Sequence, residues 1–487
     1  MKHLRGPAVP PKQELVMRAY SHALRDEYFK ALPQFEELIE AGDPPAEILS
    51  SYATCLMYVG RMEEAAAHYE RALAMKPAMP TYFDNMIFCV DHASTTTPQK
   101  ALSLRREWWH RYGQVIAQGR QPHTNDRDSE RPLRVGYVSG DFKSHSASFS
   151  FSLVVLRHSP AVQAFCYFTS PGQFWDEWSS IYSQEATLRH VHGQDAPTIA
   201  EFIRRDKIDI LVDLSAFSNF GRLDVFCLKP APIQVTAWGY ILGTGLDTMD
   251  AIFGDPIALP YSDQPYFSER IVHLPVILPY VGPLYGPEVK PMPVLSGEPF
   301  TFGAFSRPAK VNPSTLRLWG DVLRAVPKSR LLFKVPLTEH KEYQQQVLRG
   351  LGVPAHRVIF EGYSPHDKHL AAWSRVDLGL DPYPAAGGVS MVEALWQGVP
   401  HVTRAGDRII NRIGPSVYSH LGLEDFVVKD ADEYVATARR WATEGVETLA
   451  QWRGRLRELV FKSPLAQGYV EAVEDAYREL FRDWARL

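Results

Sequence analysis

The first 117 residues repeat a pattern of small and aromatic positions with a period of 34 residues. Ala31 and Phe35 lie in one apolar stripe, and Ala65 and Tyr69 stand 34 positions later in a second stripe of the same form. This period is typical of the helix-turn-helix units of tetratricopeptide repeats, and a poorer third copy follows. The pattern predicts short helical repeats over residues 1–117, with an ordinary amphipathic helical bundle as the alternative.

A different pattern begins after a polar segment. Residues 118–131 read QGRQPHTNDRDSER and predict a linker, and short apolar strands then alternate with helical stretches over residues 132–272. A proline-rich crossing over residues 273–295 predicts a second linker. The alternation restarts over residues 296–463, and residues 464–487 predict amphipathic helices that pack back across the first half.

Alternating strands and helices predict a parallel sheet with crossover helices. The fold class expected is therefore a set of α-helical repeats followed by two Rossmann-like, doubly wound α/β domains. Two such domains in tandem bind ligands in the cleft between the carboxyl ends of their strands.

Composition narrows the possible partners. The 487 residues carry a net charge of -4 with both signs interspersed, which argues against a nucleic-acid binder, because phosphate contacts need a basic face. Cys55, Cys89, Cys166 and Cys227 lie far apart without metal-ligand spacing, so we expect reduced thiols. No segment has the apolar run of a signal peptide or a membrane span, and we expect a cytoplasmic protein whose partners are small molecules or proteins.

The segment DPYPAAGGVSMVEALWQG, residues 381–398, is the first candidate binding element. It joins the apolar strand VDLGLD to a helix, and Gly387 and Gly388 leave room for an anion against the free amides of that helix start. Ser390 adds a hydroxyl, and Glu393 lies about one turn further, where a carboxylate can accept two ribose hydroxyls. The alternative is a tight loop whose glycines serve a positive φ, followed by a core helix with a solvated glutamate.

Two cations follow another strand at its carboxyl end. Arg307 and Lys310 lie between the strand Phe300–Phe305 and a helix capped by Asn312. Two cations at this position can neutralise a diphosphate leaving group, which a metal-free transferase needs. The alternative is a pair of solvated surface charges.

Histidines complete the candidate site. His366 and His369 begin a helix after a strand, where they can meet a base or a ribose, although an ordinary helix position is the alternative for each. His145 follows the first strand of the first α/β segment and can act on a sugar or an acceptor hydroxyl. A glycine-rich loop is expected to close over a sugar, unless its residues only serve the turn: Gly239, Tyr240, Gly243 and Gly245.

The sequence lacks the characteristic motifs of several enzyme classes. No Asp-x-Asp sits at a strand end in the manner of metal-dependent sugar transferases, and no GxxxxGK[ST] or GxGxxG follows a strand. Kinases, ATPases and nicotinamide dehydrogenases are therefore excluded.

Four motifs occur in an order that resembles a known family. LRVGYVSGDFKSH, KPAPIQVTAWGY with a following Met-Asp, FxxxxKxxPSTLxxW and EALWQGVPHVT resemble the tetratricopeptide-repeat protein O-linked N-acetylglucosaminyltransferases and their bacterial homologues, glycosyltransferase family 41. The resemblance covers the chain from Arg131 to its end, with short helical repeats in front. It implies a GT-B architecture and an inverting, metal-independent transfer of N-acetylglucosamine from UDP-N-acetylglucosamine to Ser or Thr hydroxyls of a protein, with no cofactor beyond the donor.

The resemblance also assigns roles. Lys310 resembles the lysine on the diphosphate, Glu393 the acid on the ribose, and His369 the histidine beside the uracil. The backbone of Ser364 and the side chain of His366 lie where the family reads the base. His145 resembles the active-site histidine near the sugar and the acceptor.

The chain departs from the family at several of these positions. Gly388, Val389 and Ser390 stand where the family commonly shows His-Thr-Thr, and Arg307 stands where it often has glutamine. Asp209 falls where the family often has a histidine that contacts the sugar. These departures leave the identity of the transferred sugar open.

The leading hypothesis is a transferase that uses UDP-N-acetylglucosamine and a protein or peptide acceptor. Its alternatives are a transferase that uses another nucleotide sugar, such as a hexose donor, or that acts on asparagine, and a catalytically inactive scaffold that binds through its repeats. A nucleotide-sugar epimerase of similar architecture needs neither acceptor nor repeats and ranks lower. The short repeat array makes a homodimer one expected assembly.

Overall fold

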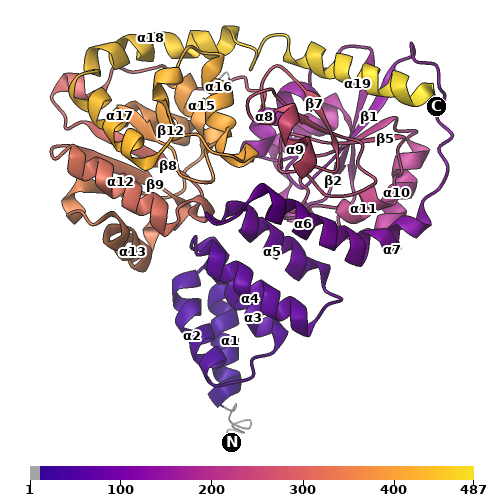
Figure 1. Cartoon of the computed structure of the whole chain (residues 1–487), viewed down its shortest axis with the longest axis horizontal. Coiled ribbons are helices and arrows are strands. Elements are labelled where there is room, and N and C mark those ends of the chain that lie inside the picture. Colours follow the sequence, from indigo (N-terminus) through magenta and orange to yellow (C-terminus); the bar gives the residue numbers. More distant parts are fainter. Residues whose placement is uncertain (1–10, 284, 487) are drawn as a thin grey trace, which may run out of the picture.

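The structure is a computed structural model that describes residues 11–283 and 285–486. Its N-terminal helices lie below two α/β units, which stand side by side, and the last two long helices run across the top of both (Figure 1). The helical part contributes the following helices: α1 Pro11–Leu24, α2 Tyr28–Glu40, α3 Ala46–Tyr58, α4 Met62–Met75, α5 Pro80–His92, α6 Pro98–Trp108 and α7 Gln114–Ile116.

The 34-residue period corresponds to buried positions on successive hairpins. Ala31 and Phe35 on α2, and Ala65 and Tyr69 on α4, are all fully buried. Gly60 has a φ of 86° in the turn between α3 and α4, a conformation that side-chain-bearing residues rarely adopt. The predicted helical repeats are therefore confirmed.

The first α/β unit is built on seven parallel strands in the order β3-β2-β1-β4-β5-β6-β7. Its strands are β1 Leu133–Ser139, β2 Val162–Phe168, β3 Thr187–His190, β4 Ile210–Asp213, β5 Ile233–Thr236, β6 Ala251–Gly254 and β7 Arg270–His273. Its helices are α8 Ser146–Val155, α9 Glu177–Glu185, α10 Ala196–Arg205 and α11 Leu223–Cys227. The central strands are apolar and buried, as a sheet covered on both faces requires.

The second unit is built on six parallel strands in the order β10-β9-β8-β11-β12-β13. Its strands are β8 Thr301–Phe305, β9 Arg330–Lys334, β10 Val358–Glu361, β11 Leu378–Leu380, β12 His401–Arg404 and β13 Val427–Val428. Its helices are α12 Pro313–Ala325, α13 Lys341–Leu351, α14 His366–Ala372, α15 Val389–Trp396, α16 Ile413–Ser419, α17 Ala431–Thr443 and α18 Val446–Lys462. Both sheets reverse their strand order in the doubly wound manner, so the predicted fold class is confirmed.

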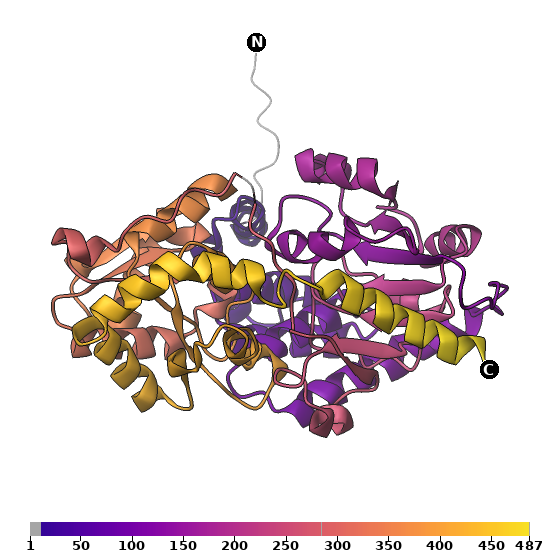
Figure 2. The ribbon, with the colours of Figure 1, turned by 90° about the horizontal axis from the view of Figure 1, so that it is seen from above.

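The chain returns to the first unit at its end. Helix α19, Tyr469–Ala485, lies over the first sheet while α18 lies over the second, as the view from above shows (Figure 2). Trp238 donates to the hydroxyl of Tyr469 at 2.8 Å, and His158 pairs with Glu474 at 2.9 Å. These buried contacts tie the two ends of the α/β region together.

The helical part contacts both α/β units. An added Cβ at Gly60 would lie 2.7 Å from the carbonyl oxygen of Pro308, in the loop after β8, so only glycine permits this approach. The rings of Phe29 on α2 and Tyr343 on α13 lie 5.5 Å apart. On the other side α6 packs against the loop after β5. Within the described residues no helix combines the length and apolar character needed to cross a membrane.

Candidate active site

The carboxyl end of β8 places Lys310 beneath the glycine loop. Asn312 caps α12 by accepting from the amide of Thr315 at 2.8 Å, which fixes the end of the β8–α12 loop. The ammonium of Lys310 then donates to the carbonyl oxygen of Ala386 at 2.5 Å. The two separate sequence elements, the cation loop and the glycine loop, are therefore in direct contact.

A buried carboxylate organises the same loop from below. Asp381 follows β11 and accepts from the amide of Gly387 at 2.6 Å and from the hydroxyl of Thr403 at 2.7 Å. Burial and the neighbouring Arg307 lower the pKa of Lys310, and the charge of Asp381 opposes this shift only in part. A partly desolvated ammonium of this kind gains strongly from an anionic ligand.

Gly387 and Gly388 differ in the space that surrounds them. An added Cβ at Gly387 would lie 2.9 Å from Oδ1 of Asp381, whereas one at Gly388 would meet only Leu278, at 3.7 Å. Neither glycine has a positive φ, so the turn interpretation of this pair is wrong. Gly387 permits close packing, and Gly388 leaves space at the start of α15, next to Val389 and Ser390.

Glu393 lies one turn into α15 and is held by histidine. Its side chain is only 4% exposed, and Nε2 of His366 lies 2.7 Å from Oε1. Nδ1 of His366 lies 2.6 Å from the hydroxyl of Tyr285, in the segment that crosses between the two units. A chain of hydrogen bonds therefore runs from Tyr285 through His366 to the carboxylate.

His369 and Ser364 flank this chain. Nε2 of His369 lies 3.7 Å from the second carboxylate oxygen of Glu393, and burial lowers the pKa of this imidazole, which keeps it neutral. The hydroxyl oxygen of Ser364 is buried and has no hydrogen-bond partner among the described residues. His369, predicted to lie beside the base, thus lies beside the predicted ribose acid.

Arg307 joins the two α/β units. Its guanidinium donates to the hydroxyl of Ser146 at 2.8 Å and lies 3.4 Å from Nε2 of His145, both at the start of α8 in the first unit. Nδ1 of His145 lies 3.3 Å from Asp141. Burial lowers the pKa of His145 to about 4, and Arg307 acts in the same direction, so the imidazole is neutral near pH 7. We call the region between the two carboxyl-end loops, from His145 to Glu393, the inter-sheet site.

The helical part adds a further histidine. His92 ends α5, and burial together with the charges of Lys310 and Arg307 lowers its pKa to about 4. Its Nδ1 lies 2.9 Å from the carbonyl oxygen of Phe88. The end of α5 therefore lies close to the cation loop.

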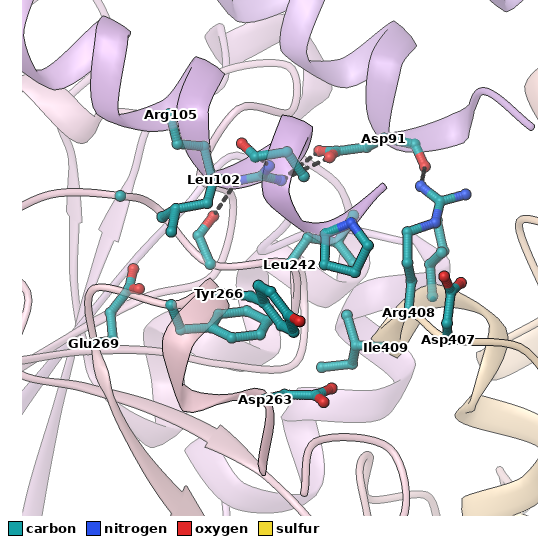
Figure 3. Close-up of a pocket in the computed structure, with 16 residues that line it drawn as sticks. Asp91, Leu102, Arg105, Leu242, Asp263, Tyr266, Glu269, Asp407, Arg408 and Ile409 are labelled. Carbon is teal, nitrogen blue, oxygen red and sulfur yellow. Dashed lines mark hydrogen bonds and ion pairs between the residues drawn. The ribbon is translucent and has the colours of Figure 1, made fainter. Parts of the chain in front are cut away.

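The glycine-rich loop after β5 is hydrogen-bonded to helix α6. The carbonyl oxygen of Gly243 accepts from Arg105 at 3.0 Å, and Arg105 also forms a bidentate pair with Asp91 at 2.7 Å (Figure 3). The hydroxyl of Tyr240 donates to the same carboxylate, and an added Cβ at Gly245 would collide with Arg105. These three loop residues therefore pack against the helical part, and their expected role over a sugar stays a prediction.

The same view shows how the junction is closed from the second unit. Arg408, in the loop after β12, donates to the carbonyl oxygen of Asp91 at 3.0 Å (Figure 3). It also donates to the carbonyl oxygen of Ala93 at 3.0 Å. Gly239 differs from the rest of its loop, because an added Cβ there would lie 1.9 Å from the carbonyl oxygen of Leu214, after β4. Gly239 thus stays at the carboxyl edge of the first sheet.

Asp209 does not belong to the site. It precedes β4 and is fully buried at the amino edge of the sheet, where it pairs with Arg131 at 2.7 Å and accepts from Asn125 at 2.8 Å. Sugar-side loops lie at the opposite, carboxyl edge. The predicted contact between Asp209 and a sugar is therefore wrong, and its role is to hold the segment before β1.

Several residues of the inter-sheet site have no role among those predicted from the sequence: Asp141, Phe149, Tyr285 and Asp381. Asp141 and Asp381 carry a readable signal, since each is an acid just beyond a buried strand. Phe149 and Tyr285 reach the site only through contacts between segments far apart in the sequence. Across the described residues, no three His, Cys, Asp or Glu side chains gather in a group that could hold a metal ion.

Two doubly wound parallel sheets, with cations, a helix start and a carboxylate between their carboxyl edges, define the GT-B class of nucleotide-sugar glycosyltransferases. The chain belongs to glycosyltransferase family 41, whose model matches residues 110–282 and 293–472.

Known proteins resemble the chain over most of its length. It is 32% identical over 413 residues to a protein of Solanum lycopersicum named "Probable UDP-N-acetylglucosamine--peptide N-acetylglucosaminyltransferase SPINDLY". The matched region covers 82% of this chain and 44% of that protein. A relative of Arabidopsis thaliana named SEC is 29% identical over 314 residues, 62% of this chain and 32% of its own length. The chain thus spans less than half the length of these curated relatives.

A solved structure has the same fold. A mutant form of the Thermobaculum terrenum O-GlcNAc transferase superposes with a TM-score of 0.89 at 26% identity, covering 98% of this chain and 92% of that one. The likeness extends over the helical part and both sheets.

Proposed function

We propose that this protein transfers a sugar from a nucleoside diphosphate donor to a hydroxyl group of a protein, with inversion at the anomeric carbon and without a metal ion. UDP-N-acetylglucosamine is the first donor to test, and Ser or Thr is the acceptor residue. Membership of glycosyltransferase family 41 and the names of its relatives support this class of reaction.

One observation carries the proposal: Arg307 reaches from the second sheet to His145 and Ser146 on the first. A cation that can neutralise a departing diphosphate therefore stands beside an imidazole that can act on an acceptor. GT-B chemistry needs both at one place, because bond breaking and bond formation occur at the same anomeric carbon.

The donor's diphosphate would lie between the cations and the helix start. Lys310, Arg307 and the amides that follow Gly388 can together replace the divalent ion that other transferases use. The space beside Gly388 and the lowered pKa of Lys310 both favour an anion here. Glu393 would accept the ribose hydroxyls, with His369 against the base.

The transfer itself would be a single displacement. The acceptor oxygen attacks the anomeric carbon from the face opposite the diphosphate, the bond from that carbon to the phosphate oxygen breaks, and its electron pair leaves with the nucleoside diphosphate. The acceptor proton passes to the imidazole of His145, whose Nδ1 lies 3.3 Å from the carboxylate of Asp141. A neutral imidazole at pH 7 suits this role, because it can accept a proton.

The direct test is donor turnover by wild-type protein and by Lys310→Ala. Release of nucleoside diphosphate is measured with UDP-N-acetylglucosamine, UDP-glucose and GDP-linked sugars, with and without a Ser/Thr-rich peptide library. We expect turnover with one donor and a fall of about 10²–10³-fold in kcat for Lys310→Ala, the usual effect of removing one group that stabilises developing negative charge. Lys328→Ala, which removes an exposed lysine from the turn before β9, is the matched control.

An active Lys310→Ala variant would remove Lys310 from the mechanism. A folded wild-type protein that turns over no nucleotide sugar would favour the scaffold hypothesis instead. Turnover of a donor other than UDP-N-acetylglucosamine would keep the reaction class and correct the sugar.

A further inference from the structure

Protein groups contact both nitrogens and one face of the His366 imidazole. Nε2 lies 2.7 Å from Glu393, Nδ1 lies 2.6 Å from the hydroxyl of Tyr285, and the ring of Phe149 stacks on its face at 4.1 Å with an angle of 20°. Its side chain is 13% exposed. A histidine in this environment has no nitrogen left with which to read a base.

The hydrogen bonds have one consistent direction. The Glu393 carboxylate only accepts, so Nε2 donates to it, and Nδ1, where it carries no proton, accepts from the hydroxyl of Tyr285. Partial burial and the nearby Glu393 raise the pKa of Tyr285, so its hydroxyl keeps the proton that it donates. Tyr285 therefore selects the tautomer of His366 that points an N–H at Glu393.

The stacking partner comes from the opposite unit. Phe149 lies on α8, one turn after His145, and it also packs against Trp178 at 5.2 Å between ring centroids. Rotation of the imidazole away from Glu393 would break this stacking. The orientation of the carboxylate thus depends on contacts that form only when the two sheets are docked.

We propose that His366 is a positioning residue for Glu393, that Tyr285 fixes its tautomer and that Phe149 fixes its ring, so that recognition of the donor's ribose is coupled to docking of α8. This inference rests on the proposed function, in which Glu393 accepts the ribose hydroxyls. It separates the two histidines of α14: His366 orients the acid, and His369 remains for the base.

The quantity to measure is the ratio of the affinities for a ribonucleotide and its deoxyribonucleotide. If His366 only stabilised the fold, its replacement would not change this ratio. Binding of UDP and 2′-deoxy-UDP is measured by calorimetry, or of GDP and 2′-deoxy-GDP if wild-type protein prefers guanine. We expect wild type to favour the ribonucleotide, and His366→Phe, which keeps the stacking but removes both ring nitrogens, to reduce that ratio about tenfold, the usual worth of a hydrogen bond to a charged group.

Two more variants separate the parts of the device. Tyr285→Phe should reduce the ratio in the same direction by a smaller factor, and Tyr363→Phe, an exposed tyrosine before α14, is its matched control. His366→Gln can return an amide N–H to Glu393 and should restore part of the ratio. Phe149→Leu should lower the ratio as well, because the unstacked ring can turn.

The outcomes distinguish the inference from the function beneath it. A wild-type protein that binds no nucleotide contradicts the proposed function. A wild type that binds without ribose preference removes the role of Glu393, and the inference with it. A wild type that prefers the ribonucleotide, with the same ratio in His366→Phe and Tyr285→Phe, overturns the positioning role alone.

Discussion

The junction between the helical part and the first sheet offers a quantitative prediction. Asp91 and Arg105 are 2% and 3% exposed and form a bidentate pair at 2.7 Å. Tyr240 donates to the same carboxylate. Asp91→Ala would leave a buried guanidinium without its counter-charge, and breaking a buried pair in this way costs about 3–5 kcal/mol.

A neighbouring ion pair, between α6 and the loop after β5, supplies the control. Arg106 pairs with Asp247 at 2.5 Å, but the side chain of Asp247 is 53% exposed. Removal of an exposed ion-pair partner costs about 0–1 kcal/mol, since water replaces the lost interaction. Asp247 also accepts from Nε1 of Trp109 at 2.9 Å, and the loss of one such hydrogen bond adds about 1 kcal/mol. Asp247→Ala should therefore lower the free energy of unfolding far less than Asp91→Ala.

The assay is urea unfolding followed by tryptophan fluorescence, to which Trp108 and Trp109 at the end of α6 contribute. Asp91→Leu combined with Arg105→Met should recover much of the lost stability, because both charges are then absent. Equal losses for Asp91→Ala and Asp247→Ala would refute this account of the junction.

Three further predictions concern the inter-sheet site. Burial holds the pKa of His145 at about 4, below its unfolded value near 6.5, so stability should fall as pH drops from 6.5 toward 4. Turnover should be lost below about pH 4 as the base is protonated, and melting curves and pH profiles of wild type and His145→Asn check both predictions. Turnover should be unchanged by EDTA, and a loss that Mg²⁺ or Mn²⁺ restores would contradict the metal-free mechanism. Gly387→Ala should cost about 1–3 kcal/mol because its methyl group meets Asp381, whereas Gly388→Ala should melt like wild type.

The architecture could be predicted from the sequence because the patterns that indicate it are local and repeated. The 34-residue period and the alternation of apolar strands with helices predicted the repeats and both sheets. The strands that escaped prediction carry no such signal: β3 reads TLRH and is mostly exposed at a sheet edge, and β13 has two residues. The expected linker from residue 273 overlaps β7 for a similar reason, since this strand is a short edge strand.

The site residues could be predicted from the sequence where they follow a strand directly. Lys310 and the glycine loop could be placed together because parallel strands bring their carboxyl ends to one edge. The prediction for Asp209 was wrong because this residue precedes its strand and so lies at the amino edge of the sheet. The stacking of Phe149 on His366 could not be predicted, because it joins residues 217 positions apart through the docking of two units.

The central claim is that the inter-sheet site binds a nucleoside diphosphate, and the most direct measurement is the melting temperature of wild-type protein titrated with UDP, GDP and CMP. A ligand that binds only the folded state raises the melting temperature as its concentration rises. We expect a dose-dependent rise with one nucleoside diphosphate, abolished in Lys310→Ala. No rise with any of the three nucleotides would contradict it.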